Sequence, residues 1–150
     1  MKHLFILRGL PGCGKSSFIQ KNGLENFTLS TDEIRLRLTT PSLNENGELY
    51  IRQDRNNTVF NVLNGMLETR MRNGETTFID ATNVYYRHIT DYLKLAKRYN
   101  YETFLLEFYH PLRHREVMYN NLTREPYKRV PPQVIDEMAL YYNEEKAKIN

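Results

Sequence analysis

The sequence predicts an α/β fold, in which a single domain is built around a central parallel sheet flanked by helices. The chain has 150 residues, the usual size of one domain. Short apolar segments alternate with longer segments of helical period, as expected of strand and helix units in a parallel sheet. Hydrophobic residues make up 40% of the chain and charged residues 26%, which is the balance of a globular protein.

Four short apolar runs predict the strands of this sheet, at residues 3–7, 27–29, 76–79 and 103–108. Between and after them, apolar side chains recur every three or four residues, which predicts helices that each bury one face in the core. These faces comprise Val59, Val62, Leu63, Met66 and Leu67 within 49–72; Ile89, Tyr92, Leu93, Ala96 and Tyr99; and Val134, Ile135, Met138 and Tyr142.

Two polar segments predict loops. Residues 39–48 contain Pro41 and Gly47 together with Asn and Ser, so we expect an irregular backbone there. Residues 122–132 read LTREPYKRVPP, in which Pro126 interrupts any helix and Pro131 or Pro132 can begin the last one.

Charge and cysteine content narrow the class of protein. The formal net charge is +3, which suits a polyanionic partner but is also common in other enzymes. Cys13 is the only cysteine, so an intrachain disulfide is impossible and a reducing compartment is expected. The amino-terminal apolar run ends at Arg8, far short of a signal peptide or a membrane span. These observations predict a soluble cytoplasmic domain with no membrane partner.

A phosphate-binding loop follows the first predicted strand, where Gly9, Gly14, Lys15 and Ser16 match the pattern G-x-x-x-x-G-K-[ST]. Glycine allows the backbone to direct successive N–H groups at phosphate oxygens, and the following helix adds its free amino-terminal N–H groups. Lys15 can then reach the β and γ phosphates, and the Ser16 hydroxyl is suited to bind Mg²⁺. We expect ATP or another NTP to contact Gly9, Pro11, Gly12, Cys13, Gly14, Lys15, Ser16 and Ser17.

The alternative for this loop is a chance glycine-rich turn before a helix. The apolar strand before it and the helix-compatible SSFIQK after it argue against that alternative, because the motif requires both. Cys13 occupies a variable position of the motif, so we expect a tolerated small residue there rather than a nucleophile. The predicted fold class is therefore an α/β domain of the P-loop NTPase type.

An acidic and a basic residue follow the second predicted strand. Ser30 or Thr31 can cap the next helix, which places Asp32 in its first turn, at the carboxyl edge where parallel sheets bind ligands. A carboxylate there can accept a proton from an alcohol that attacks phosphorus, and Arg35 lies on the same helical face. The alternative is that Asp32 only favours the helix amino terminus and Arg35 pairs with it.

A second acidic residue, Asp80, follows the third predicted strand in the sequence TFIDATN. This is a usual place for the acid that holds Mg²⁺, directly or through water, opposite the phosphate loop. Thr82 and Asn83 extend the polar edge beyond it. The alternative is that Asp80 caps the next helix.

The segments GLPGCGKSS, STDEIR, DATN, NNLTR and VPPQVI resemble, in the same order, the 5′-hydroxyl kinase domain of phage and bacterial polynucleotide kinases. The resemblance extends from residue 2 to about residue 142. It implies that Asp32 acts as general base on a 5′-OH and that Arg35 binds phosphate at the reacting end. It also implies that Asp80, Thr82 and Asn83 lie at the acceptor end of the site.

The resemblance also implies a helical lid at about residues 112–132, from which Arg124 stabilises charge on the transferring group. Family members often carry two lid arginines, but Asn120 occupies the position of one of them. Arg113, Arg115 or Lys128 are candidates to replace it.

Basic and aromatic residues surround this segment, as expected of a groove for single-stranded nucleic acid. The cations are Arg113, Arg115, Arg124, Lys128 and Arg129, interleaved with Tyr119 and Tyr127, and Arg52 and Arg55 lie before the long predicted helix. Residue by residue, core packing of tyrosine and contact of arginine with ATP alone are the favoured explanations.

The sequence therefore predicts an ATP-dependent kinase, with Mg²⁺, of the 5′-hydroxyl end of single-stranded DNA or RNA, and it is compatible with a homo-oligomer. The predicted catalytic residues are Lys15, Asp32, Arg35 and Arg124. A first alternative keeps the chemistry and changes the acceptor to a small-molecule or nucleoside hydroxyl. A second alternative is a nucleotide-dependent switch that transfers nothing, which would not require the pair of Asp32 and Arg35.

Overall fold

The computed structural model describes residues 2–149, with side chains for residues 2–144. Its centre is a four-stranded parallel sheet with the strand order β2-β5-β1-β6. The strands are β1 (His3–Arg8), β2 (Thr28–Ser30), β5 (Thr77–Asp80) and β6 (Glu102–Glu107). All four predicted strands and the α/β class with a parallel sheet are confirmed.

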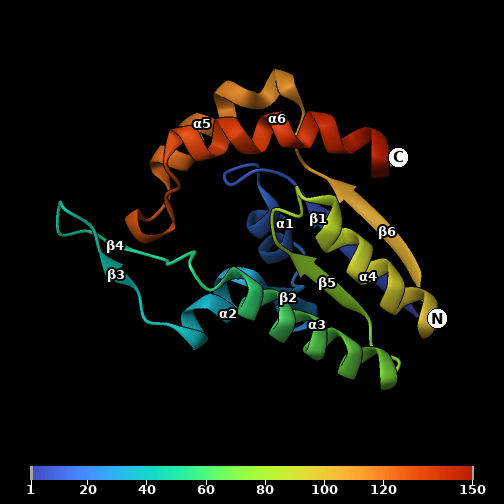
Figure 1. Ribbon diagram of the computed structural model, residues 1–150. Helices are drawn as coiled ribbons and strands as arrows, with labels where there is room; N and C mark the ends of the chain where they lie inside the picture. The colour runs from blue at the N-terminus through green and yellow to red at the C-terminus, as the bar shows by residue number, and fades with distance from the viewer. Residues whose placement is uncertain (1, 150) are drawn as a thin grey trace.

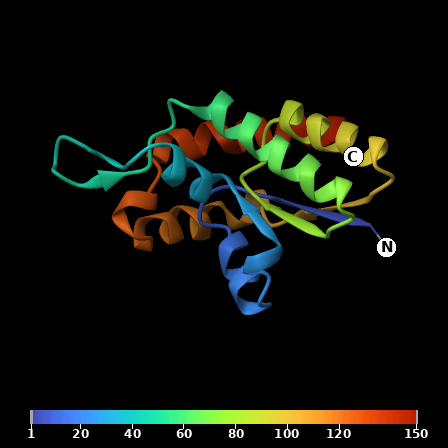
Figure 2. The ribbon, with the colours of Figure 1, turned by 90° about the horizontal axis from the view of Figure 1, so that it is seen from below.

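Helices cover both faces of the sheet (Figures 1 and 2). Viewed from below, α1 lies on one side of the sheet, whereas α3 and α4 lie side by side on the other. The α-helices are α1 (Lys15–Lys21), α2 (Thr31–Leu38), α3 (Asn56–Arg72), α4 (Tyr86–Arg98), α5 (His114–Thr123) and α6 (Pro132–Ile149). Short 3₁₀ turns occupy η1 (Glu25–Phe27), η2 (Pro111–Arg113) and η3 (Pro126–Lys128).

The strand register brings the ends of three strands together. Asp80, the last residue of β5, pairs with Leu7 of β1 on one side and with Ser30 of β2 on the other. The segments that leave these strands therefore start from one edge of the sheet, which is where parallel sheets bind their ligands.

The main core lies between the sheet and the helices α3 and α4. Its α3 side chains are Val59, Leu63, Leu67 and Met71, which follow one another every four residues. The predicted face was too wide, because Met66 and Leu93 lie on the outer sides of α3 and α4 and are more than 40% exposed. A helix that lies flat on a sheet buries a narrow stripe, and residues at its margin stay in solvent.

The segment before α3 differs from its prediction. Residues 49–55 are not helical, because Leu49–Tyr50 form β4, which pairs antiparallel with β3 (Ser42–Leu43). The segment predicted as irregular is therefore a hairpin that projects from the body of the protein (Figure 1). Its turn is closed by the Asn44 side chain, which accepts hydrogen bonds from the backbone N–H groups of Asn46 and Glu48 at 2.9 Å.

A second core cluster joins α5 and α6 to the loop after β1. Beside it, the fully buried Arg8 donates hydrogen bonds to the backbone oxygens of Asn83 (3.0 Å) and Val84 (3.2 Å). The same guanidinium pairs with Glu107 at 3.3 Å and lies 3.9 Å from the ring centre of Tyr142. Arg8 therefore connects the central strand to the helix α6, which begins at Pro132 as predicted.

Candidate active site

One continuous cleft of about 1470 Å³ follows the carboxyl edge of the sheet. Its walls come from the phosphate loop, α2, the hairpin, the first turns of α3 and α4, and the segment that joins α5 to α6. Ordinary small-molecule sites occupy about 300 to 1,000 Å³, so this cleft has room for more than one small ligand.

The predicted phosphate loop forms one end of this cleft. Lining residues from the loop are Pro11, Gly12, Cys13, Gly14, Lys15, Ser16 and Ser17. Gly9 lies outside the lining, and its N–H donates to the Thr82 oxygen at 3.0 Å. Gly12 and Gly14 have φ angles of 86° and 98°, which side chains other than glycine rarely adopt. The backbone therefore adopts, at Gly12 and Gly14, the conformations for which the sequence analysis expected glycine.

Lys15 lies folded back into the loop. Its Nζ donates to the backbone oxygens of Gly9 (2.8 Å) and Leu10 (3.1 Å), and it lies 3.6 Å from the Cys13 sulfur. The side chain is almost fully buried, so the ammonium is held in place by neutral acceptors alone. A charged phosphate oxygen is a stronger partner for an ammonium than a neutral carbonyl, so this cation is available to an anion in the loop.

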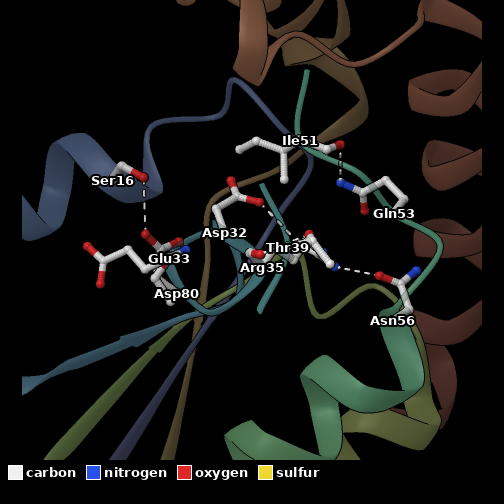
Figure 3. Close-up of polar contacts among 10 residues, drawn as sticks. Ser16, Asp32, Glu33, Arg35, Thr39, Ile51, Gln53, Asn56 and Asp80 are labelled. Atoms are coloured by element: carbon white, nitrogen blue, oxygen red, sulfur yellow. Dashed lines mark hydrogen bonds and ion pairs between the residues drawn. The ribbon is translucent and has the colours of Figure 1, made fainter. Parts of the chain in front are cut away.

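Ser16 and Asp80 meet at the floor of the cleft. The Ser16 hydroxyl donates to Oδ2 of Asp80 at 3.0 Å (Figure 3). Asp80 does not cap the next helix, since α4 begins at Tyr86 with no side-chain cap. A hydroxyl and a carboxylate side by side are the oxygen ligands that Mg²⁺ prefers, so this pair fits the predicted metal position.

Asp32 and Arg35 face each other in the first turns of α2, which Ser30 caps by accepting a hydrogen bond from the Glu33 N–H. Arg35 Nη1 contacts Asp32 Oδ1 at 3.1 Å, and Nη2 donates to Asn56 Oδ1 at 2.8 Å (Figure 3). The Asp32 side chain stays 40% exposed although that of Arg35 is only 11% exposed. The pairing that the sequence analysis gave as the alternative to a catalytic role therefore exists. It leaves the Asp32 carboxylate partly exposed at the cleft.

Two buried guanidinium nitrogens in the cleft wall have no hydrogen-bond partner among the described residues. They are Nε of Arg35 and Nη1 of Arg124. Buried N–H donors are almost always paired in folded proteins, so an unpaired donor beside a cleft indicates a position for an acceptor from a ligand.

Hydrogen bonds fix the segment predicted as a lid, both within itself and to the chain after the hairpin. Asn121 donates to the Val130 oxygen at 2.7 Å and accepts from its N–H at 3.0 Å, which holds the chain that carries Arg124 in a closed loop. The Ile51 N–H donates to the Tyr127 oxygen at 3.0 Å, so this loop also contacts the residue directly after β4. A hydrogen bond with Glu125 raises the pKa of Tyr127, with burial and the charge of Asp32 as further causes.

The prediction that Asn83 lies at the acceptor end of the site is wrong. This residue was expected to bind the acceptor, but it is fully buried and does not line the cleft. Its backbone is left-handed, with a φ of 49°, which turns the side chain into the core. There its amide donates to the Leu7 oxygen at 2.6 Å and accepts from the Tyr92 hydroxyl at 2.9 Å, so Asn83 holds the loop after β5 in shape. Asp80 and Thr82 do line the cleft.

The predicted basic surface is partly present. Lys128, Arg129 and Tyr127 line the cleft, but Arg115, Tyr119, Arg52 and Arg55 do not. Arg52 instead pairs with Asp54 at 2.7 Å. Arg113 lines the cleft, yet its guanidinium donates to the backbone oxygens of Cys13 and Phe108 and pairs with Glu116. Of the three candidates to replace the second lid cation, Lys128 thus remains. It lines the cleft, and no ion pair with an acidic residue is found for it in the described part of the chain.

Sequence reasoning missed a group of cleft residues from α3 and the start of α4. They are Asn56, Phe60, Tyr85, Arg87 and His88. Phe60 lies beside the buried stripe of α3 rather than in it. A large aromatic residue next to the apolar periodicity could have indicated a residue that borders a binding site. The residues from α4 follow the DATN segment directly, but only the tertiary fold shows that they face α3.

A glycine-rich loop at the carboxyl edge of a parallel sheet, followed by Lys15 and Ser16, defines a P-loop nucleotide-binding fold. The chain belongs to a family of AAA domains, whose model matches residues 4–144. A comparison with curated protein sequences found no match. In the described residues, no helix combines the length and apolar character required to cross a bilayer.

Solved structures share this fold at low sequence identity. A chain in the Pnkp1/Rnl/Hen1 RNA repair complex superimposes with a TM-score of 0.78 and 21% identity, covering 99% of this chain and 46% of that one. A chain of the AvrRxo1-ORF1:-ORF2 complex with ATP gives a TM-score of 0.73 and 16% identity, covering 99% and 49%. The protein thus spans about half the length of these chains, and the predicted resemblance to a polynucleotide kinase domain is confirmed for the fold.

Proposed function

We propose that the protein transfers the γ-phosphate of ATP to the 5′-hydroxyl end of DNA or RNA. The observation that carries this proposal is the position of the Asp32 and Arg35 pair, which lines the same cleft as the phosphate loop. The pair follows β2, which β5 separates from the strand β1 that precedes the loop. Phosphoryl transfer requires this arrangement, because the attacking oxygen must approach the γ-phosphorus in line with the leaving group.

The nucleotide half of the site consists of the phosphate loop and the lid. Backbone N–H groups around Gly12 and Gly14 would hold the phosphates, and Lys15 would exchange its carbonyl partners for phosphate oxygens. Arg124 would direct its unpaired Nη1 at the transferring group. Ser16 and Asp80 would hold Mg²⁺, which neutralises phosphate charge when it is bound.

The acceptor half of the site centres on Asp32. Its partly exposed carboxylate would accept the proton of the attacking hydroxyl, so that the oxygen forms its bond to phosphorus while the bond to ADP breaks. Arg35, held in place by Asn56, would orient Asp32 and bind phosphate through its unpaired Nε. Direct transfer of this kind needs no covalent intermediate on the protein.

The choice of a polynucleotide acceptor is supported by the rest of the cleft. Arg87, Lys128 and Arg129 line it, and such cations suit a phosphodiester backbone. A chain with a similar fold belongs to an RNA repair complex. Glu45 and Glu48 line the hairpin end, so the favourable path for a polyanion lies along the other walls.

An assay of phosphate transfer from labelled ATP tests this function. We expect label on oligonucleotides with a 5′-OH and none on the same oligonucleotides with a 5′-phosphate, with DNA and RNA tested in parallel. Label on free nucleosides or other small alcohols, but not on either oligonucleotide, would replace the polynucleotide by a small acceptor. ATP hydrolysis without label on any alcohol would indicate a nucleotide-dependent switch.

A further inference from the structure

Two aromatic rings from different helices stack in the cleft wall. Phe60 of α3 and His88 of α4 have ring centres 3.6 Å apart and planes inclined by 13°. Both residues line the cleft and both are only half-buried. Phe60 also packs against the main core, and the inner faces of the two rings cover each other. The outer parts of the pair that border the cleft are available to a planar ligand.

His88 is uncharged at neutral pH. Burial lowers its pKa to about 4, helped by the positive charges of Arg87 and Arg35, although Asp91 acts in the opposite direction. No hydrogen bond joins its ring nitrogens to the described part of the chain. A neutral imidazole has one donor and one acceptor nitrogen, so His88 presents a flat, uncharged surface with a free polar edge rather than a cation for phosphate.

The stacked pair lies next to the acceptor half of the site. Asn56, which holds Arg35 at 2.8 Å, precedes Phe60 by four residues and therefore lies on the same side of α3. The charge of Arg35 also helps to lower the pKa of His88. A group that stacks on Phe60 and His88 is therefore a neighbour of the hydroxyl that Asp32 activates.

A cation and a further aromatic ring continue this wall. The Arg87 guanidinium lies 4.9 Å from the ring centre of Tyr85, and both residues line the cleft. Aromatic faces that alternate with cations are how proteins hold single-stranded nucleic acid, since bases stack while phosphates pair with charge.

We propose that Phe60 and His88 form the stacking surface for the terminal nucleobase of the acceptor, with Arg87 beside it for the next phosphodiester. This inference rests on the proposed function, because it assigns a position in the acceptor half of that site. It makes a nucleotide unit, rather than the hydroxyl alone, the feature that the protein recognises.

The test uses a 5′-OH oligonucleotide with the fluorescent base 2-aminopurine at its first position, whose emission is quenched when the base stacks. Protein binding is followed separately by the anisotropy of a dye at the 3′ end. We expect quenching with the wild-type protein. The double variant Phe60→Leu with His88→Leu, which keeps apolar volume and removes both rings, should lose the quenching and raise the KM for the oligonucleotide about tenfold.

The matched control is Phe27→Leu with Tyr86→Leu, which removes two exposed aromatic rings outside the cleft and should leave quenching and KM unchanged. An acceptor with an abasic first position should have the same KM with wild type and with the Phe60 and His88 double variant. Anisotropy that rises without quenching, together with normal phosphate transfer, would overturn this inference and leave the proposed function intact. Quenching without phosphate transfer would overturn the proposed function and leave the stacking of the base on the two rings intact. The absence of any anisotropy change would overturn the proposed function and this inference together.

Discussion

Asn120 donates a hydrogen bond from its side-chain amide to the backbone oxygen of Gly12 at 3.0 Å, which joins the helix α5 to the phosphate loop. The contact is close, because a Cβ added at Gly12 would lie 2.8 Å from the Val117 oxygen and 3.1 Å from the Asn121 nitrogen. Asn120, a neutral residue, thus fixes the segment predicted as a lid to the phosphate loop.

Replacing Gly12 by alanine should therefore disturb both elements. The φ of 86° is strained for alanine, and the added methyl group would push α5 away from the loop. We expect a loss of stability of about 1 to 3 kcal/mol and a marked loss of ATP affinity, measured by chemical denaturation and calorimetric titration. Gly65→Ala is the control, since its Cβ would meet nothing within 4 Å inside α3 and should stabilise by about 0.5 to 1 kcal/mol. Equal effects at both glycines would contradict this account.

Lys15→Ala should lower turnover by a factor of about 100 or more, because it removes a cation from the charge that develops on the γ-phosphoryl group. The measurement is kcat in the oligonucleotide assay. The variant also frees the backbone oxygens of Gly9 and Leu10, so a thermal melt must accompany the kinetics. A normal kcat in a folded Lys15→Ala protein would argue against the phosphate-loop assignment.

Asp32→Asn should abolish transfer while ATP affinity stays close to that of the wild type. The amide keeps the size of the side chain and can still accept a hydrogen bond from Arg35, but it cannot take a proton from the acceptor. Glu33→Gln is the matched control, since Glu33 occupies the same helical turn, is exposed and lies outside the cleft lining. Full activity of Asp32→Asn would remove the general-base role.

Arg8→Met should destabilise the protein by about 1 to 3 kcal/mol, the usual effect of leaving buried hydrogen-bonding groups without their partner. The substitution leaves Glu107 without this cation and frees the backbone oxygens of Asn83 and Val84. Denaturant unfolding measures the loss. A change below about 1 kcal/mol would show that α6 does not depend on this contact for its position.

Stability should also depend on the protonation of His88. The folded protein holds its pKa near 4, below the ordinary value of 6.5, so the unfolded chain binds a proton first as the pH falls. The contribution of neutral His88 to the free energy of unfolding is complete above pH 6.5 and is lost as the pH falls toward 4. Denaturation of wild type and His88→Asn across this range measures it, and we expect the variant to lose less stability. Parallel curves for the two proteins would contradict the burial of a neutral imidazole.

The sequence predicted those parts of the molecule whose signals are local. Each strand is an apolar run, the loop around Gly12 is a contiguous motif, and Asp32 and Arg35 meet because they are three residues apart on one helix. The hairpin was missed because two strands of two residues each leave no alternating pattern. Asn83 was misassigned because its left-handed backbone, which decides where the side chain points, has no signature beyond the residue type.

Other parts depend on contacts between distant segments, which no local pattern contains. The rest of α3 and the strand β5 separate Phe60 from His88 along the chain, and only the packing of α3 against α4 makes the two residues neighbours. The same is true of Asn120, whose role follows from its distance to Gly12. Periodicity assigns such residues to a helix face but does not identify what that face touches.

The hydrogen bond from Ile51 to Tyr127 has a mechanical consequence. It joins the residue that follows β4 to the turn η3 between α5 and α6, so neither segment can move away from the cleft without breaking this bond. In a two-substrate reaction, this bond would couple the movement that admits the phosphate donor to the movement that admits the acceptor.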